Sequence, residues 1–413
     1  MTPPRLGRLH FSGLTSLRDV ELELATDVTV LIGANGSGKS NLVTALELLS
    51  RILDGQLQDT LLQRGGFGRH LHVAPKPADD AERISLIVWS DQDADGVYNG
   101  YRAELESTVD DAPVLRETVF PRSAVKPPKG PSGETFGRSR ESVLSITQSN
   151  ERLEHFLGTV RPLLDGIRVY HFDDVGATAP TKKWHSVDDD VILHADAGNL
   201  APYLLRLKSE HPGAYQRIVT VIRNVAPFFD DFVLKPNSSE QIRLRWRQRG
   251  ISDRVFSASE LSDGTLRFAC LATLLLSPDA PRVIVLDEPE LGLHPFAITQ
   301  LAALIRQATV RGRQAIVATQ SALLLDEFPL ESVALLDRKD GATTVSRPDP
   351  AALEAFVDEY SLSDLWQMNI LHTGTSLGRP CPARVGDLGD RRDRHWSNVR
   401  RELCGERGPN RHQ

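Results

Sequence analysis

The spacing of apolar and polar positions changes several times along the chain, and each change marks a different predicted element. Two short apolar segments, at residues 9–11 and 20–24, precede the β-branched run 28–33, which predicts a buried strand ending in glycine. From Lys39 the apolar residues recur at helical spacing, at Leu42, Val43, Leu46, Leu49 and Leu53. This part of the chain therefore predicts a strand, a glycine loop and a helix in direct succession.

Residues 84–120 have the alternating pattern of antiparallel strands. The segments "ISLIVWS" and "YNGYRAELES" flank the polar stretch "DQDADGV", and "VLRETVF" follows them. This pattern predicts a meander, which we assign to a separate β lobe. Residues 124–140 are rich in Pro, Gly, Ser and basic residues, which predicts a loop or a disordered linker.

The middle of the chain predicts helices around one strand. Helical spacing is found around residues 143–164 and 199–225, and "IRVYHF", residues 167–172, predicts a strand between them. A sustained apolar heptad over several turns is absent from this region. The sequence therefore excludes a long coiled coil here.

From Val255 the chain again alternates between helix and strand. "LRFACLATLLL" and residues 296–309 predict helices, while "RVIVL" and "QAIVAT" predict strands. The segment "SVALLDRKDGATTVSR" predicts a hairpin whose turn lies at Asp340 and Gly341. The whole pattern is typical of an α/β fold.

Composition narrows the classes of partner. Acidic residues outnumber Lys and Arg by 55 − 48 = 7, so the chain has no overall positive charge to hold a nucleic acid, and any such contact must be local. The arginine-rich segment beyond Arg379 could touch nucleic acid, but its few apolar residues favour a disordered tail. No segment has the pattern of a signal peptide or a membrane span, which predicts a cytoplasmic protein without a membrane partner.

The loop after the first predicted strand has the chemistry of a phosphate site. Gly33 and Gly38, followed by Lys39 and Ser40, fit the pattern of glycine, four residues, glycine, lysine and serine between a strand and a helix. We expect backbone N–H groups to face phosphate oxygens, Lys39 to reach the β- and γ-phosphates of ATP, and Ser40 to bind Mg²⁺. A glycine-rich turn that merely starts a helix is the alternative. The remaining candidate ATP-binding residues of this loop are Ala34, Asn35, Gly36, Ser37 and Asn41.

A second strand supplies carboxylates that could complete this site. Asp287 follows four apolar residues in "VIVLDEPE" and is the candidate Mg²⁺ ligand, together with Ser40. Glu288 is the next residue and the candidate general base for the attacking water. An acidic turn after a buried strand is the alternative for these two residues alone.

A third motif, "LSDGT", directly precedes an apolar helix and lies ahead of the Asp287 strand. It resembles the signature motif of ABC-type ATPases, and together with "DEPELGLHP" it resembles the RecF-like and OLD-like branch of bacterial AAA-family ATPases. In that family the signature residues contact the γ-phosphate held by the opposite protomer. The resemblance therefore implies that Ser262, Asp263 and Gly264 bind ATP across a homodimer that forms on ATP binding. A capped helix start gives similar letters, which is the alternative for this pentapeptide alone.

The resemblance implies the fold, and the residue patterns along the chain predict its division into parts. It predicts an α/β P-loop NTPase of the ABC ATPase type with an antiparallel β lobe and an inserted helical lobe. The predicted parts are an N-terminal ATPase lobe at 1–123, a linker and mainly helical lobe at 124–254, a C-terminal ATPase lobe at 255–379 and a disordered tail at 380–413.

One position differs from the family's usual pattern, and two others have an open role. Gln320 occupies the place of the family's switch histidine, and its amide can donate to a γ-phosphate oxygen but cannot carry charge. We include it among the catalytic candidates with Lys39 and Glu288, and we expect slow hydrolysis. Gln148 is a candidate for the family's Q-loop glutamine, although a surface position is the simpler interpretation. His294 we interpret as a residue that packs or caps at the next helix, rather than as a ligand.

Three functions are compatible with these motifs. The first is an ATPase that works in DNA repair or in defence against phage and plasmids, with DNA or a nuclease or effector protein as partner. The second is an OLD-like nuclease, which needs a set of metal-binding carboxylates that we do not find near the C-terminus. The third is the ATPase subunit of an ABC transporter, which the long middle block disfavours.

Overall fold

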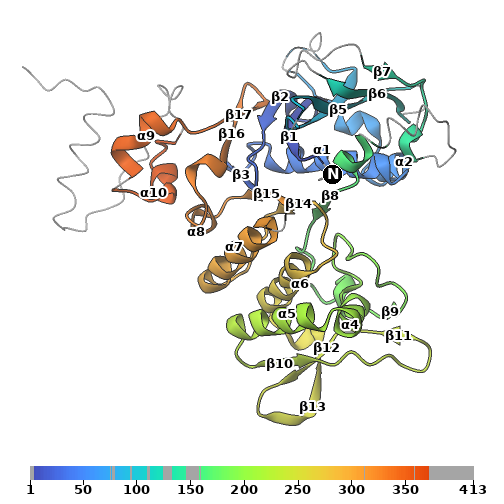
Figure 1. Ribbon diagram of the computed structural model, residues 1–413, viewed down its shortest axis with the longest axis vertical. Coiled ribbons are helices and arrows are strands. Elements are labelled where there is room, and N and C mark those ends of the chain that lie inside the picture. The colour runs from blue at the N-terminus through green and yellow to red at the C-terminus, as the bar shows by residue number, and fades with distance from the viewer. Residues whose placement is uncertain are drawn as a thin grey trace, which may run out of the picture. The chain divides into compact units, whose positions relative to one another are not determined.

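The computed structural model describes residues 4–74, 76, 80–93, 95–108, 112–123, 133–145, 158, 160–310, 312–357 and 359–371 (Figure 1). All of them belong to one compact unit, Met1–Thr373. Among them lie two six-stranded sheets, two smaller sheets and a set of helices that cover them. The predicted tail after Arg379 and the candidate glutamine Gln148 lie outside the described residues.

The central sheet has the strand order β17-β16-β3-β15-β14-β8. The strands β3, β14, β15, β8 and β16 are parallel, and β17 closes the sheet edge as an antiparallel hairpin partner. All five residues of β3 are buried, as expected for a parallel strand covered on both faces. The bounds are β3 Val28–Ile32, β8 Ile167–Tyr170, β14 Val283–Asp287, β15 Gln314–Thr319, β16 Val333–Lys339 and β17 Ala342–Ser346.

The hairpin between β16 and β17 turns at the two predicted residues. Asp340 and Gly341 have φ values of 51° and 81°, which is the left-handed region that a two-residue hairpin turn requires. The sequence prediction for this hairpin is confirmed.

The second large sheet is antiparallel, with the order β2-β1-β4-β5-β6-β7. The predicted meander is present in an antiparallel β lobe, but it does not form a sheet of its own, because β1 pairs with β4 and brings the N-terminal hairpin into the same sheet. Part of the predicted linker is also ordered, since β7 pairs with β6. The bounds are β1 Leu6–Leu14, β2 Leu17–Glu23, β4 Arg83–Ser90, β5 Tyr98–Glu106, β6 Val114–Ser123 and β7 Glu134–Thr135.

Helix α1, Lys39–Leu53, shares one apolar core with both large sheets. Its buried residues Leu42, Leu46 and Leu49 belong to a cluster that also contains Phe11 of β1 and Val285 of β14. Because the hydrophobic effect favours burial of all these surfaces together, most of the buried apolar residues of the antiparallel sheet belong to this shared core. Ile87, Trp89 and Phe120 form a small separate cluster of that sheet. A short helix, α2 at Leu57–Gln63, follows α1.

The middle of the chain contains more strand than the sequence predicted. The predicted helical stretch 199–225 forms two helices, α4 Leu200–Glu210 and α5 Pro212–Val225, because a proline follows His211 and disfavours a continuous helix there. Two small sheets accompany them. They contain β10 Phe229–Phe232, β12 Arg245–Gln248 and β13 Ile251–Ser257, and separately β9 His185–Ser186 and β11 Gln241–Ile242.

The predicted helix at 143–164 is described only at its ends. Val143–Ser145 is a 3-10 turn, and residues 160–164 are helical. The predicted strand after it is confirmed as β8, and it lies at the edge of the central sheet beside β14. The division of the chain into four parts stays a prediction.

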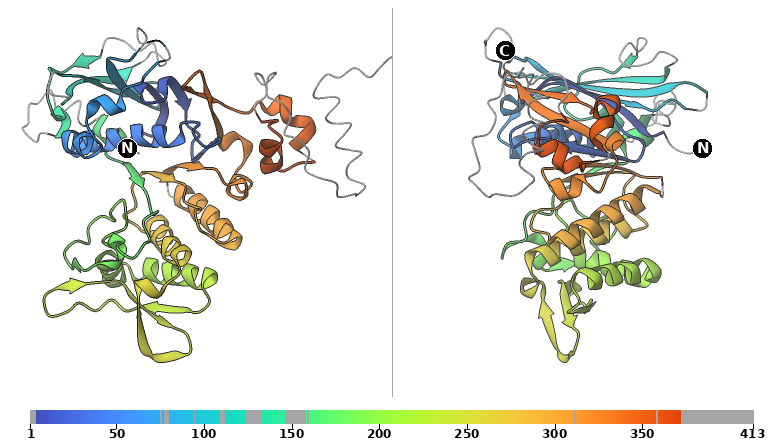
Figure 2. Two further views of the ribbon diagram at one scale, coloured as in Figure 1. Left: turned by 180° about the vertical axis from the view of Figure 1, so that it is seen from behind. Right: turned by 90° about the vertical axis from the view of Figure 1, so that its left-hand side faces the viewer.

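The remaining predicted helices are confirmed. Helix α6, Asp263–Leu276, contains the buried run 266–276, and α7, Pro295–Val310, connects β14 to β15 (Figure 2). Three shorter helices follow β15 and β17. They are α8 Ala322–Leu325, α9 Pro350–Val357 and α10 Leu362–Gln367.

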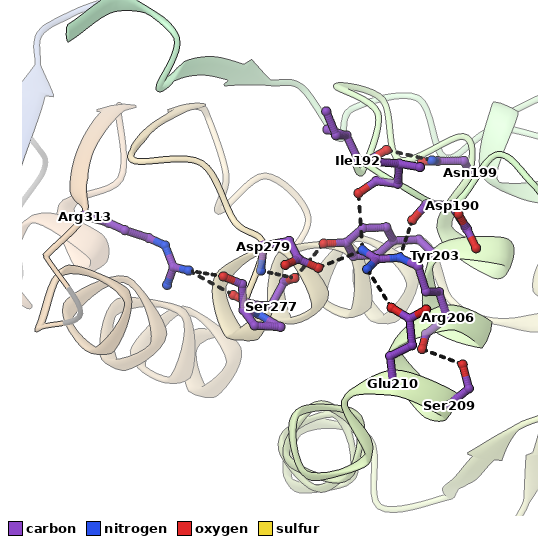
Figure 3. A network of polar contacts seen from close by, with 12 residues as sticks. Asp190, Ile192, Asn199, Tyr203, Arg206, Ser209, Glu210, Ser277, Asp279 and Arg313 are labelled. Atoms are coloured by element: carbon purple, nitrogen blue, oxygen red, sulfur yellow. Dashed lines mark hydrogen bonds and ion pairs between the residues drawn. The ribbon is translucent and has the colours of Figure 1, made fainter. Parts of the chain in front are cut away.

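A polar network fastens α4 to the connection between α6 and β14 (Figure 3). The Tyr203 hydroxyl lies 2.6 Å from the Ser277 hydroxyl, and Arg206 forms an ion pair with Asp279 at 2.8 Å. Arg313, just before β15, donates to the Pro278 carbonyl at 2.7 Å. The network therefore connects α4 with the starts of both β14 and β15, so α4 and the central sheet share fixed contacts.

Gln314 joins the two large sheets through both ends of its side-chain amide. The Leu6 N–H donates to its Oε1, and its Nε2 donates to the Leu6 carbonyl, each at 2.8 Å. The Gln314 side chain is buried, so its removal would leave two backbone groups of β1 without partners in an apolar setting.

We predict that Gln314→Ala lowers the free energy of unfolding by about 3 kcal/mol, because two buried backbone groups lose their partners. Urea denaturation followed by circular dichroism would measure this. Gln63→Ala, at an exposed helix position, is the matched control and should leave the midpoint unchanged. Equal midpoints for both variants would show that Gln314 does not hold the sheets together.

Candidate nucleotide site

The loop between β3 and α1 curves tightly and leaves its tip exposed. Gly36 and Gly38 have φ values of 79° and 106°, which glycine adopts without strain. A Cβ atom at Gly36 would meet no atom within 4 Å, whereas one at Gly33 would lie 2.6 Å from the Ser37 Oγ. The start of the loop at Gly33 is therefore tightly packed. Its tip is open, because Ala34, Asn35 and Gly36 are exposed.

Lys39 is the first residue of α1 and folds back over this loop. Its Nζ donates to the carbonyls of Gly33 at 2.7 Å and Ala34 at 3.4 Å, and the residue is only 5% exposed. Burial lowers the pKa of the Lys39 ammonium from its ordinary value, and the nearby Glu288 and Asp287 carboxylates oppose that shift. Glu288 and Asp287, which are about 250 residues from Lys39 in the sequence, thus act electrostatically on this lysine.

A hydroxyl network supports the loop from the side opposite its tip. The Ser16 Oγ lies 2.6 Å from the Thr343 Oγ1, which donates to the Ser37 carbonyl at 2.9 Å. The Asn41 amide donates to the same Ser16 hydroxyl at 2.7 Å. The Asn41 side chain is therefore turned toward the β1–β2 hairpin and holds the loop, while Ser40 beside it is exposed.

Asp287 ends β14 at the same sheet edge as the loop. Its Oδ1 is buried and has no hydrogen-bond partner, and its Oδ2 lies 3.7 Å from the His171 Nδ1. Burial raises the pKa of Asp287, and the adjacent histidine opposes that shift. A buried carboxylate oxygen without a partner is costly, and a bound cation would satisfy it.

Glu288 has an unusual backbone conformation next to this carboxylate. Its φ of 46° lies in the left-handed region, and its N–H donates to the Ala318 carbonyl at 2.8 Å. The Gln320 amide Nε2 donates to the Glu288 Oε1 at 2.8 Å. Backbone strain of this kind is typical of functional sites, and here it turns the glutamate toward Gln320.

Glu290 is a third carboxylate at this edge, and it holds the end of β15. Its Oε1 accepts hydrogen bonds from the Thr319 hydroxyl and from the Gln320 N–H, while its Oε2 is buried without a partner. Burial raises the pKa of Glu290, and the Thr319 hydrogen bond opposes that shift. Gln320 is therefore fixed by one glutamate through its backbone and by another through its side chain.

The signature motif starts helix α6. Ser262 is the N-cap residue, and its Oγ accepts a hydrogen bond from the Thr265 N–H at 3.2 Å. A Cβ atom at Gly264 would lie 2.5 Å from the Gly292 carbonyl oxygen, so the motif packs tightly against the segment after β14. Ser262 and Asp263 are exposed, and Asp263 forms a long 3.9 Å ion pair with Lys182.

Arg267, one turn into α6, connects the signature helix with the carboxylate edge. Its guanidinium donates to the carbonyls of Phe172 at 2.6 Å and Asp173 at 3.0 Å, and also to the Leu291 carbonyl. These two segments follow β8 and β14. Together with Tyr170, Asp287 and Glu288, Arg267 lines a small pocket beside the carboxylates.

His294 caps the next helix, as the sequence predicted. Its Nδ1 accepts from the Phe296 N–H at 3.3 Å, at the start of α7.

Within the described part of the chain, no group of three or more His, Cys, Asp or Glu side chains is arranged to hold a metal ion. The described helices are also too short or too polar to span a bilayer.

The sequence matches a known family of P-loop domains. The family model described as "AAA domain, putative AbiEii toxin, Type IV TA system" matches residues 28–326, which is most of the chain and includes all three motifs. The chain belongs to this family. As a member of a family of P-loop ATPase domains, it carries a nucleotide-binding fold.

Solved structures share this fold at low sequence identity. The SMC head bound to the C-terminal winged-helix domain of ScpA aligns over 83% of this chain and 98% of its own, with a TM-score of 0.58 and 15% identity. An SMC head domain with an extended coiled coil, from a complex with ScpA of Pyrococcus furiosus, gives a TM-score of 0.57 and 14% identity over 86% of this chain and 99% of its own. The predicted ABC-type ATPase fold is therefore confirmed, with its parallel core sheet and antiparallel β lobe.

Transporter ATPases are similar over part of the sequence. An ATP-binding protein EcfA2 of an energy-coupling factor transporter, from Streptococcus agalactiae serotype Ia, is 28% identical over 167 residues, 39% of this chain and 55% of that protein. The EcfA2 of Streptococcus thermophilus LMD-9 is 25% identical over 230 residues, 52% of this chain and 76% of that protein. The chain thus spans about half the length of the first of these relatives.

This P-loop ATPase domain brings together most of the predicted site residues. Lys39, Asp287, Glu288 and Gln320 gather at one edge of the central sheet. Within the described ranges, no hydrogen bond or ion pair joins the signature residues 262–264 to 33–41. The site residues that the sequence did not reveal are His171, Arg267, Glu290 and Thr319. For His171 a signal existed, because it lies near the end of the predicted strand 167–172 and directly follows β8.

We predict that Lys39→Ala lowers ATP affinity by about 100-fold, because a charge-assisted contact of ~3 kcal/mol to phosphate is lost. Isothermal titration calorimetry would measure this. Lys183→Ala, at an exposed position in the middle of the chain, is the matched control and should bind ATP as the wild type does. Unchanged affinity in Lys39→Ala would disprove the assignment of this loop as the phosphate site.

Proposed function

We propose that the protein hydrolyses ATP at composite sites formed between two copies of the chain. The observation that carries this proposal is the gathering of Lys39, Asp287 and Glu288 at one sheet edge, while the exposed Ser262 lies at a separate helix end of the same chain. One copy would supply the phosphate loop and carboxylates, and the other would supply the signature helix.

The residues at the sheet edge fit Mg²⁺ and the phosphates of ATP. The buried Asp287 Oδ1 lacks a partner, and the exposed Ser40 hydroxyl is one residue beyond Lys39, which supports both as metal-holding groups. Gly33, Gly36, Ser37 and Gly38 would offer backbone N–H groups to phosphate oxygens. The ion would supply charge neutralisation for the β- and γ-phosphates.

Glu288 would act as the general base that accepts a proton from the attacking water. The Gln320 amide donates to Glu288, which supports a role for Gln320 in holding this glutamate. A direct contact of Gln320 with phosphate is a second proposed role. A neutral amide cannot carry the charge that a histidine could carry there, so slow hydrolysis remains our expectation.

Exposed apolar residues near the carboxylate edge support dimer formation. Leu291 follows β14 and is 53% exposed, Phe296 opens α7 and is 48% exposed, and Leu323 follows β15 and is 52% exposed. Burial of such side chains against a partner would stabilise a dimer through the hydrophobic effect. A second chain that brings Ser262 to this edge would cover them.

For the cellular process we propose defence against phage or plasmids, or DNA repair, with DNA or a nuclease or effector protein as partner. The family description, which names a toxin of a type IV toxin–antitoxin system, supports the defence role. A transporter ATPase is the second candidate, supported by the partial similarity to EcfA2 proteins. We also propose that the chain is a member of the RecF-like and OLD-like branch.

We predict that Glu288→Gln lowers the rate of ATP hydrolysis by about 10²–10⁴-fold, because the general base is lost while Asp287 still holds the metal. ATP should then trap the dimer. Multi-angle light scattering with saturating Mg²⁺ and ATP would show it, and Glu331→Gln, at an exposed glutamate after β15, is the matched control. A Glu288→Gln protein that stays monomeric under these conditions would contradict the composite site.

We predict that Ser262→Arg binds ATP with wild-type affinity but neither dimerises nor hydrolyses it. The bulky cation would fill the space that the partner's γ-phosphate needs, while the chain's own phosphate loop is untouched. Calorimetry, light scattering and a phosphate-release assay together test this, with Ser209→Arg on α4 as the control. Hydrolysis at the wild-type rate by Ser262→Arg would exclude a role for the signature helix.

A further inference from the structure

Arginine residues alternate along the central strand of the small β10-β12-β13 sheet. They are Arg243, Arg245, Arg247 and Arg249, and we call them the arginine row. Successive side chains of a strand point to opposite faces, so Arg245 and Arg247 of β12 share one face, and Arg243 and Arg249 continue the same spacing at its two ends. Figure 1 shows β12 between β10 and β13.

The opposite face of this strand is fixed in an apolar core. Leu244 and Trp246 are 1% and 2% exposed, and the Trp246 ring stacks on Phe256 of β13 with centroids 4.8 Å apart. The Trp246 indole N–H also donates to the Ser257 carbonyl at 3.0 Å. Since this face is buried, the register of β12 is set up to Arg247, and Arg245 and Arg247 are held on the opposite face. Arg243 and Arg249 lie just outside the strand and are exposed.

The arginine row is not neutralised by ion pairs. Arg243, Arg247 and Arg249 are exposed, and no carboxylate in the described part of the chain forms an ion pair with any of them. Asp231 lies opposite Arg247 in the ladder, but its carboxylate accepts from the Tyr215 hydroxyl at 2.7 Å and pairs with Lys208 at 3.3 Å.

The local charge is opposite to that of the chain. Residues 241–257 contain five arginines and one aspartate, so their net charge is 5 − 1 = +4, while the whole chain carries −7. Arg254 is the fifth arginine, and it forms an ion pair with Glu260. A concentrated positive charge on an acidic protein is the electrostatic pattern of a surface that binds a polyanion.

We propose that the arginine row binds the phosphodiester backbone of duplex nucleic acid. Arg243 to Arg247 span roughly 13 Å of strand, and one strand of B-form DNA places about four phosphates along that length. The planar guanidinium group matches phosphate oxygens in pairs, which favours a phosphate ligand over a diffuse contact. This surface contacts backbone only, so we expect no preference for base sequence.

An exposed aromatic residue extends the surface at one end. The Arg243 guanidinium lies over the Trp184 ring, 4.8 Å from its centroid, and Trp184 is 45% exposed. An acidic protein segment is the competing ligand. Arg245 is half-buried and its guanidinium donates to the Lys235 carbonyl at 2.8 Å, so the exposed charges of the row are those of Arg243, Arg247 and Arg249. Three exposed arginines close together favour a polyanion with a charge on every unit, because a protein segment rarely presents carboxylates at one fixed interval.

The surface is close in sequence to the signature motif. Strand β13 ends at Ser257, which forms a capping box with Glu260, and Ser262 caps α6 two residues later. The proposal names the partner class of the proposed ATPase and rests on that function for its cellular role. Binding itself needs no ATP, so it can be tested separately.

The test is fluorescence anisotropy with a labelled duplex DNA of 20 base pairs, over a series of salt concentrations and without nucleotide. The variant Arg243→Gln, Arg247→Gln, Arg249→Gln removes three charges and leaves the buried face unchanged. We expect the slope of log affinity against log salt to fall in magnitude by about 1 per arginine, so by about 3 in total. Arg217→Gln, at an exposed position on α5, is the single-charge control and should leave affinity and slope unchanged.

Three outcomes would overturn the proposal. They are no DNA binding by the wild type at low salt, equal salt slopes for wild type and triple variant, and tighter binding of polyglutamate than of DNA by the wild type. Comparing variants of the full chain also cancels any contribution from the arginine-rich tail. If the triple variant loses DNA binding but keeps wild-type ATP affinity, and Lys39→Ala keeps DNA binding, then the DNA surface and the nucleotide site are independent.

Discussion

The parallel alignment of β3, β15 and β14 is the constraint on which the nucleotide site depends. Ile32 pairs with Thr319, and Ala318 pairs with Asp287, so the carboxyl ends of all three strands lie at one edge. Ligands of open α/β sheets bind beyond this edge, where the loops after the strands converge. Residues about 250 positions apart, such as Lys39 and Asp287, meet because the register of three strands is fixed.

Burial disfavours the charged forms of the ionisable residues at this edge. Burial lowers the pKa of Lys39 and raises the pKa values of Asp287 and Glu290, so each charged form is disfavoured by its surroundings and supported by its neighbours. Two buried carboxylate oxygens have no partner in the described part of the chain. A site with this balance favours ligands that bring both a cation and an anion, as a metal-bound nucleotide does.

Local patterns predicted the site better than they predicted the sheets. The phosphate loop, Asp287 and the turn at Asp340 follow from residue types over a few positions, and the structure has the corresponding elements there. The pairing of β1 with β4 could not be predicted, because strand pairing depends on tertiary contacts such as those of Gln314. Arg267 and Glu290 were missed for the same reason, since their partners are backbone groups and hydroxyls contributed by distant segments.

Mixing two inactive variants tests the composite site most directly. Lys39→Ala lacks a working phosphate loop and Ser262→Arg lacks a working signature helix, so each alone should hydrolyse almost no ATP. In a mixed dimer, one site would combine the intact loop of one chain with the intact signature helix of the other. We predict that the mixture regains ATP hydrolysis, well above the sum of the separate activities. A mixture no more active than that sum would contradict the account.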